Sequence, residues 1–168
     1  MAGHNTPRHA TGLNPATILN PVEVRISGGM LALNRFLMTL QNKRMPVASF
    51  TVGRDGNGEA MRATILLDCP PESARRYTTL LSALEDVEEA EAAEETAEVA
   101  LLKVGGDTWR ESAARLGVGA HEEGGTVVAS GETEKMEAWL AEINSELLED
   151  VVRLGPVARP SGTAWGGV

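Results

Sequence analysis

The stretch Val22-Glu-Val-Arg-Ile26, followed by Ser27-Gly-Gly29, decides the fold of the first half of the chain. Its apolar residues alternate with charged ones, which is the pattern of a strand with one buried face, and the two glycines then end the strand. A helical pattern comes next, with apolar residues three and four apart: Met30, Leu33, Leu37 and Leu40, with Phe36 alongside. Pro46 stops this helix.

The same alternation of elements continues to residue 91. Val47–Val52 and Glu59–Leu67 are predicted strands, and the turn Arg54–Gly58 joins them into a hairpin. Pro71–Leu84 is a predicted helix that begins with proline, and Val87–Ala90 is a short last strand. Strand, helix, strand, strand, helix, strand is the order of an α+β, ferredoxin-like βαββαβ domain.

The second half reads as a reduced α/β version of the first. Strands are predicted at Ala97–Val104, Thr126–Ser130 and Val151–Leu154, and helices at Thr108–Leu116 and Thr133–Leu147. The stretch between Leu116 and Thr126 is interpreted as a loop, so one strand and a helical turn are expected to be missing. The predicted organisation is a flexible tail at 1–20, a domain at 21–91, an acidic linker at 92–98, a second domain at 99–158 and a tail at 159–168.

Composition excludes several classes of partner. The formal net charge is -9, and an acidic chain repels nucleic-acid backbones and anionic membrane surfaces. The sequence contains no apolar run near the ~20 residues that span a bilayer and no apolar signal-peptide core at its start. The single cysteine, Cys69, rules out an internal disulfide and predicts a cytoplasmic protein.

Residues with catalytic potential do not form a recognisable set. The three histidines, His4, His9 and His121, lie in a tail and a loop without further ligands at metal-site spacing. The carboxylates of 85–98 run continuously, which favours a solvated linker over a metal site. At Ser27–Leu31 the first N–H groups of the helix could receive the carboxylate of a free amino acid, or the segment is a plain strand-to-helix loop. The sequence therefore predicts no catalytic residues and no metal.

Several motifs resemble one family. Leu33-Asn-Arg-Phe-Leu37 and Val47-Ala-Ser-Phe-Thr-Val-Gly53 resemble the ACT domain of the small, regulatory subunit of acetohydroxyacid (acetolactate) synthase. Glu98-Val-Ala-Leu-Leu-Lys-Val104 is similar to a strand of its second half, Gly131–Leu140 to a helix start, and Val152–Ala158 to its ending. The motifs occur in the family's order between residues 22 and 162.

The resemblance implies a non-catalytic subunit in branched-chain amino acid biosynthesis. It would bind and activate the catalytic subunit, and it would dimerise through its ACT sheets. The chain itself would hold no cofactor, because thiamine diphosphate, Mg and FAD would belong to the catalytic subunit. By position in the ACT loop, the effector-binding residues would be Gly28, Gly29, Met30, Leu31, Pro46 and Val47.

Three of these positions depart from the family's pattern. Gly28 and Pro46 stand where the family has asparagine, and Leu31 stands where it has glycine. Polar contacts to an amino acid are thereby lost, so the sequence favours activation over feedback inhibition by valine. A stand-alone ACT-type sensor of a branched-chain amino acid is the alternative, and a small enzyme on a ferredoxin-like scaffold is the third hypothesis.

Overall fold

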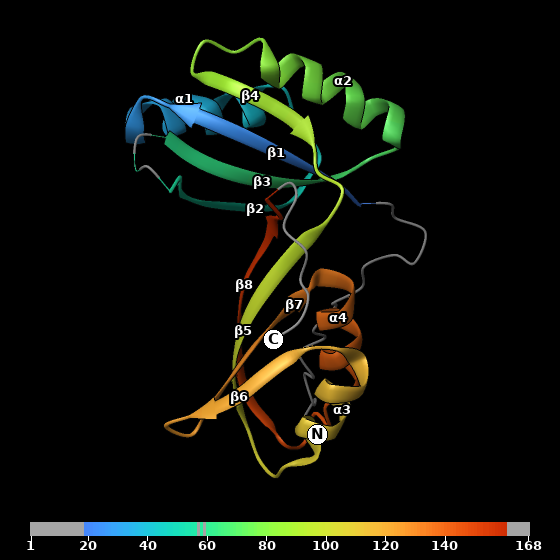
Figure 1. Ribbon diagram of the computed structural model, residues 1–168. Coiled ribbons are helices and arrows are strands. Elements are labelled where there is room, and N and C mark those ends of the chain that lie inside the picture. Colours follow the sequence, from blue (N-terminus) through green and yellow to red (C-terminus); the bar gives the residue numbers. More distant parts are fainter. Residues whose placement is uncertain (1–18, 57, 59, 161–168) are drawn as a thin grey trace, which may run out of the picture.

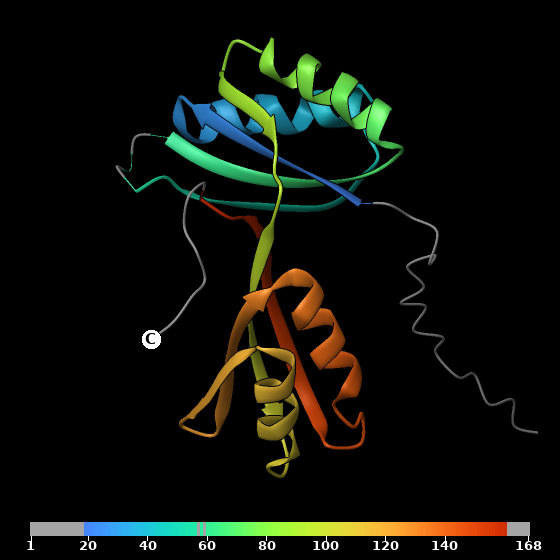
Figure 2. The same cartoon turned by 45° about the vertical axis from the view of Figure 1, so that its right-hand side comes forward.

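The computed structural model describes residues 19–56, 58 and 60–160, which form two α+β units (Figure 1). The first unit spans 19–92 and the second 96–158, and each has the order strand, helix, strand, strand, helix, strand. Figure 2 shows the two units one above the other, with a short crossing between them. The expected ferredoxin-like α+β class is confirmed. The predicted tails fall almost wholly outside the described residues.

The first unit is a four-stranded antiparallel sheet with both helices on one face. Its strand order is β2-β3-β1-β4. Its elements are β1 (Leu19–Ser27), α1 (Gly29–Asn42), β2 (Val47–Arg54), β3 (Ala60–Asp68), α2 (Pro71–Ser82) and β4 (Val87–Ala92). In β1, Val22, Val24 and Ile26 are buried beneath the helices, as the alternation predicted. Glu23 and Arg25 lie between them in sequence and belong to the opposite, open face of the sheet.

The buried face of α1 differs from the predicted one. Leu33, Phe36 and Leu40 are buried, but Met30 is 72% exposed and Leu37 is 40% exposed. The stripe that faces the sheet is therefore rotated away from the predicted one. Helix α1 carries a second apolar surface that points to solvent.

The second unit repeats the topology with shorter helices. Its sheet order is β6-β7-β5-β8, the equivalent of the first. Its elements are β5 (Thr96–Val104), α3 (Thr108–Leu116), β6 (Gly119–Glu123), β7 (Thr126–Glu132), α4 (Thr133–Glu142) and β8 (Leu148–Ala158). The core is built around Trp109, Met136 and Trp139, and the Trp139 indole N–H donates to the Trp109 carbonyl over 3.2 Å.

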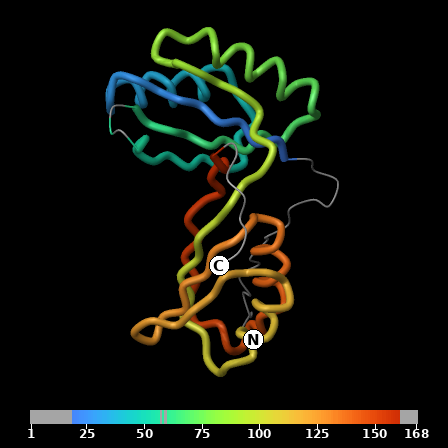
Figure 3. The backbone as a smooth tube through the Cα atoms, viewed as in Figure 1, coloured from blue at the N-terminus to red at the C-terminus, as the bar shows by residue number. Residues whose placement is uncertain are grey.

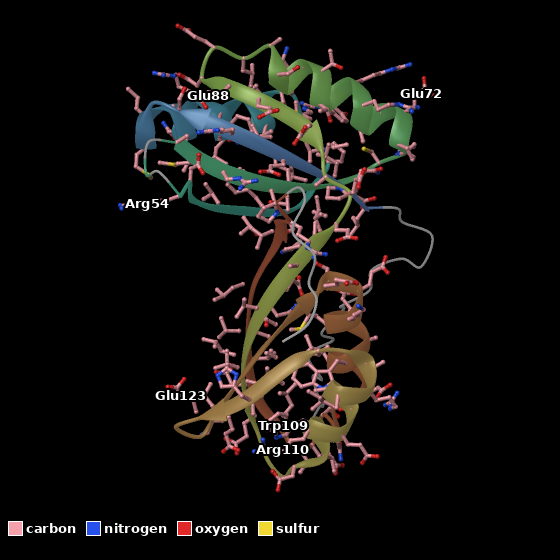
Figure 4. The ribbon with its side chains drawn as sticks, in the orientation of Figure 1. Arg54, Glu72, Glu88, Trp109, Arg110 and Glu123 are labelled. Atoms are coloured by element: carbon pink, nitrogen blue, oxygen red, sulfur yellow. The ribbon has the colours of Figure 1, made fainter. Side chains whose placement is uncertain are left out.

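The expected absence of a strand in the second unit is wrong. Residues 119–123 form β6, which pairs with β7 along the sheet edge. Helix α3 holds this strand, because the Arg110 guanidinium donates to Glu122 over 2.8 Å and also stacks on the Trp109 ring at 4.2 Å (Figure 4). The strand went unrecognised because four of its five residues are exposed and three are polar. Helix α4 ends at Glu142, short of the predicted Leu147.

The acidic stretch 92–98 is also much less of a linker than predicted. Strand β4 ends at Ala92 and β5 begins at Thr96, so 93–95 alone connect the units. Glu98 lies inside β5 and is buried, at 4% exposure. Carboxylates are tolerated in β4 because one face of its sheet is open to water.

The two units meet where β8 reaches the open face of the first sheet. The backbone N–H of Ala158 donates to the Thr64 hydroxyl over 2.7 Å, and both residues are buried. The N–H of Ala93 donates to the Pro21 carbonyl over 2.9 Å. Figure 3 shows β5 and β8 side by side up to this junction. The end of β8, a strand of the second sheet, therefore contacts the first unit as well.

Among the described helices, none combines the length and apolar character needed to cross a bilayer.

Candidate functional site

The predicted effector turn is an open, left-handed corner between β1 and α1. Gly28 has φ 101° and Gly29 has φ 67°, values that glycine adopts without strain. A Cβ on Gly28 would lie 3.0 Å from the Cβ of Ala32, so the position has no room for a side chain. Met30 and Leu31 follow at 72% and 65% exposure. These four predicted residues are adjacent and accessible.

The first turn of α1 has no side-chain cap and no acidic residue. Its N–H groups therefore keep the capacity to bind an anion that they have at any uncapped helix start. An N-terminal turn alone does not define a ligand, since nothing in it selects one anion over another. The two large apolar side chains at Met30 and Leu31 stand where polar contacts would be needed.

Pro46 and Val47 lie at the other end of α1. The helix has 14 residues, so its length of ~21 Å separates them from the Gly28–Leu31 turn within one chain. Val47 packs against the core of the first unit as the first residue of β2. One copy of the chain therefore does not bring the six predicted effector residues together.

An ion pair fixes the loop before β4 beside the effector turn. Arg35 donates to both carboxylate oxygens of Asp86, over 2.8 and 2.6 Å. The hydrogen bond from Arg35 lowers the pKa of the Asp86 carboxyl, and the same contact raises the pKa of the guanidinium. The carbonyl of Asp86 also accepts the N–H of Ser27 over 2.9 Å. Sequence reasoning missed this pair, because its partners are 51 residues apart.

A polar hollow of ≈ 430 Å³ lies on the open face of the first sheet. It is lined by Glu23, Arg25, Asp55, Arg62, Glu89 and Glu91. Arg25 pairs with Asp55 over 2.7 Å, and Arg62 pairs with Glu23. Carboxylates thus pair with both arginines, and no hydroxyl, thiol or imidazole lines the hollow. Among residues 19–56, 58 and 60–160, no group of His, Cys, Asp and Glu could hold a metal ion.

Cys69 is the single cysteine of the chain, and its side chain is half-buried. Burial first, and then the charge of Asp68, raise its pKa. A raised pKa lowers the fraction of thiolate, which is the reactive form. His121 lies on edge strand β6, where it is exposed.

The second unit contains a polar cluster that sequence reasoning did not find. Arg153 on β8 donates to Glu98 over 2.6 Å and to Glu137 over 3.0 Å. Burial opposes the charge of Arg153, but the hydrogen bonds to the two carboxylates prevail and raise its pKa. Glu98 sits on the helix-covered face of the sheet and is buried. The cluster ties β5, α4 and β8 together, so its role is structural.

Comparison with known proteins gives a structural match and no sequence match. No family model matches the chain, and no curated protein matches it by sequence. The crystal structure of the acetolactate synthase small subunit from Thermotoga maritima is similar with a TM-score of 0.68 and 14% identity, over 82% of this chain and 94% of that one. An unknown protein from Galdieria sulphuraria aligns with a TM-score of 0.37 and 16% identity, over 82% of this chain and 96% of that one. The tandem arrangement of two α+β units is therefore similar to the fold of that small subunit.

Proposed function

We propose that this chain is a non-catalytic regulatory subunit that binds the catalytic subunit of acetohydroxyacid synthase and raises its activity. The observation that carries the proposal is the tandem pair of βαββαβ units, which are similar over most of their length to an acetolactate synthase small subunit. The ordered motifs from Leu33 to Ala158 resemble the same family. In this proposal the catalytic subunit supplies thiamine diphosphate, Mg and FAD, and this chain supplies binding surfaces.

A homodimer through the ACT sheets is part of the proposal. Strand β2 is an edge of its sheet, and α1 lies close to it, as the 6.4 Å contact between the Phe36 and Phe50 rings requires. Leu37 and Met38 are exposed on α1 at 40% and 53%. A twofold axis at this edge would set two α1 helices antiparallel. Pro46 of one copy would then lie near Gly28 of the other, which would reunite the effector residues.

Activation without valine inhibition is the expected regulation. The effector turn offers helix N–H groups, but Gly28 and Pro46 stand where the family has asparagine, and Leu31 stands where it has glycine. Hydrogen bonds to a buried charged ligand contribute strongly only when the partners are fixed in place. We therefore expect the synthase rate with this chain to be insensitive to valine.

Reconstitution tests the proposal directly. The full chain is mixed with the thiamine-diphosphate-dependent synthase subunit of the same organism, and product formation is measured with and without 1 equivalent of chain and with added valine. A higher rate and co-elution on gel filtration are the expected results. Absence of both a complex and a rate change would overturn the proposal.

The uncapped start of α1 favours one alternative, a stand-alone sensor that binds an amino acid through helix N–H groups. Calorimetry of the full chain with valine, leucine and isoleucine separates the two. Tight binding of any of them, combined with no interaction with the synthase subunit, would replace our proposal by this one.

A further inference from the structure

Strand β8 is an unpaired edge of the second sheet. In the order β6-β7-β5-β8 it bonds to β5 on one side, and among the described strands none pairs with its other side (Figure 1). Residues 149–154 are all exposed, and they extend over ~20 Å before the strand reaches the first unit. An unpaired strand edge offers a row of backbone N–H and C=O groups to another extended chain. We call residues 149–154 the free edge of β8.

The backbone of the free edge has a donor that its own sheet does not use. The N–H of Val151 donates to the side-chain carboxylate of its neighbour Asp150 over 2.9 Å, so this amide is bonded at the free edge and not to β5. Successive residues of a strand turn their N–H groups to opposite sides. The N–H of Arg153 therefore also points away from β5, whereas that of Val152 faces its β5 partner, Leu101.

The free edge is apolar on both faces of the sheet. Val151 stands on the helix-covered side, because its partner in β5, Leu102, is buried there. Val152 and Leu154 alternate with Val151 and Arg153, so they stand on the open side. The exposed fractions of Val151, Val152 and Leu154 are 38%, 48% and 53%. An added strand would cover all three side chains, whereas a ligand on one face of the sheet would cover only some of them.

The other three sheet edges are protected or belong to the proposed dimer. Strand β4 has three glutamates among its six residues, and β6 has two among its five. Charged side chains at an edge hinder the addition of a further strand. Strand β2 is the edge of the proposed ACT dimer. Between residues 151 and 157, β8 carries one charge, Arg153, and its guanidinium is bonded to Glu98 and Glu137 within its own unit.

We propose that the free edge of β8 receives an extended segment of the catalytic synthase subunit, which adds to the four-stranded second sheet as a further strand. The inference rests on the proposed function, which supplies the partner, and it names where that partner binds. Main-chain hydrogen bonds give such a segment its affinity, and apolar side chains on both of its faces meet Val151 on one side and Val152 and Leu154 on the other.

The charge at the start of the free edge specifies the segment further. The Asp150 carboxylate bonds to the Val151 amide, and the chain has a net charge of -9. A lysine or arginine at the end of the segment that lies beside Asp150 would complement this charge.

Reconstitution with edge variants tests the proposal. Val151→Pro removes the outward N–H and keeps the bonds to β5, since proline is tolerated on an edge strand where its nitrogen faces solvent. Val151→Thr is the matched control, because threonine keeps the N–H and has a branched side chain of the same shape. The concentration of chain that gives half-maximal activation of the synthase should rise about 10-fold for Val151→Pro. For Val151→Thr it should stay within about twofold of the wild-type value.

Amide hydrogen exchange reports strand addition itself. In the complex the Arg153 amide should exchange more slowly than in the free chain, because its N–H gains a carbonyl partner. The Val152 amide, which already faces β5, should change less.

The outcomes separate this inference from the proposed function. If the wild-type chain activates the synthase and Val151→Pro does so equally well, or if the Arg153 amide exchanges as fast in the complex, the inference is overturned and the proposed function stands. A wild-type chain that neither binds nor activates overturns both. If Val151→Pro lowers the mass of the free chain in sedimentation velocity, a second copy occupies the edge, which also overturns the inference. If circular dichroism shows Val151→Pro to be unfolded, Leu154→Lys, which puts a protective charge on the edge, replaces it and should give the same rise.

Discussion

The hydrogen bond between the Ala158 N–H and the Thr64 hydroxyl should couple the two units. It spans 94 positions in sequence and joins the end of β8 to the open face of the first sheet. The exposed fraction of Thr64 is 3% and that of Ala158 is 9%, so water does not readily replace either partner. We predict that Thr64→Val weakens this junction specifically. Valine keeps the shape and strand preference of threonine but cannot accept a hydrogen bond.

The expected loss can be estimated from the group left unpaired. A buried donor without a partner costs about 1–3 kcal/mol, which exceeds the ~1 kcal/mol net value of an ordinary hydrogen bond. We expect Thr64→Val to lower the free energy of unfolding by about 2 kcal/mol. Exchange of the Ala158 amide hydrogen should then accelerate by about 30-fold, since 1.4 kcal/mol is a factor of ten in an equilibrium constant.

The aromatic residues allow each unit to be followed separately. The single tyrosine, Tyr77, is in α2 of the first unit, and Trp109 and Trp139 are in the core of the second. The third tryptophan, Trp165, lies outside the described residues and is replaced by phenylalanine in both proteins. Urea unfolding monitored by tyrosine absorbance and by tryptophan fluorescence should give coincident transitions for the wild type and separated ones for Thr64→Val. Thr126→Val is the control, because Thr126 is a half-buried strand threonine at the far hairpin. A loss below ~0.5 kcal/mol with the Ala158 amide still protected would refute the reasoning.

Three further predictions follow from single contacts. Arg153→Met should destabilise the second unit by about 3 kcal/mol in urea, because it leaves the buried Glu98 carboxylate without its cation; an unchanged midpoint would contradict this. Asp86→Asn should make stability fall less steeply as the solution is acidified. Arg35 lowers the pKa of Asp86, so the ion pair stabilises the fold above the ordinary carboxyl pKa of ~3.9, and this stability is lost as pH falls below it. Equal slopes for the two proteins in acid titrations followed by circular dichroism would exclude that role. Gly28→Ala should cost about 1–2 kcal/mol by thermal melting, since φ is 101° and the new Cβ meets a helix side chain at 3.0 Å; Gly29→Ala, with open space around it, should lack the steric part of that cost.

Local signals in the sequence were sufficient for the order of elements in the first unit. Alternation in β1 placed Val22, Val24 and Ile26 on the buried face, and Pro71 marked the start of α2. The prediction failed where an element gains its stability from neighbours. Strand β6 contains His121 and is mostly exposed, so its pairing with β7 and its bond to α3 could not be read from its own composition. The same holds for Glu98, whose burial depends on an arginine 55 residues later.

The turn between β1 and α1 was predicted correctly, and its role as an effector site stays a prediction. Glycines at 28 and 29 predicted the end of the first strand, and the structure gives both of them a positive φ there. The separation of Pro46 from that corner follows from the length of α1, which the sequence also contains. The exposed surface of Leu37 and Met38 needed the structure, because both apolar faces of α1 fit a helical period.

The two units serve as an internal comparison for interpreting the open sheet faces. The two sheets have the same strand order, and each carries both of its helices on one face. The fold therefore does not require the residues of the two open faces to differ. The first face pairs arginines with carboxylates and suits contact with water, whereas the second presents Leu101 between two valines. Exposing such a row has no folding benefit, since apolar surface left in water contributes nothing to the hydrophobic effect. Folding alone therefore does not account for the apolar row of the second unit.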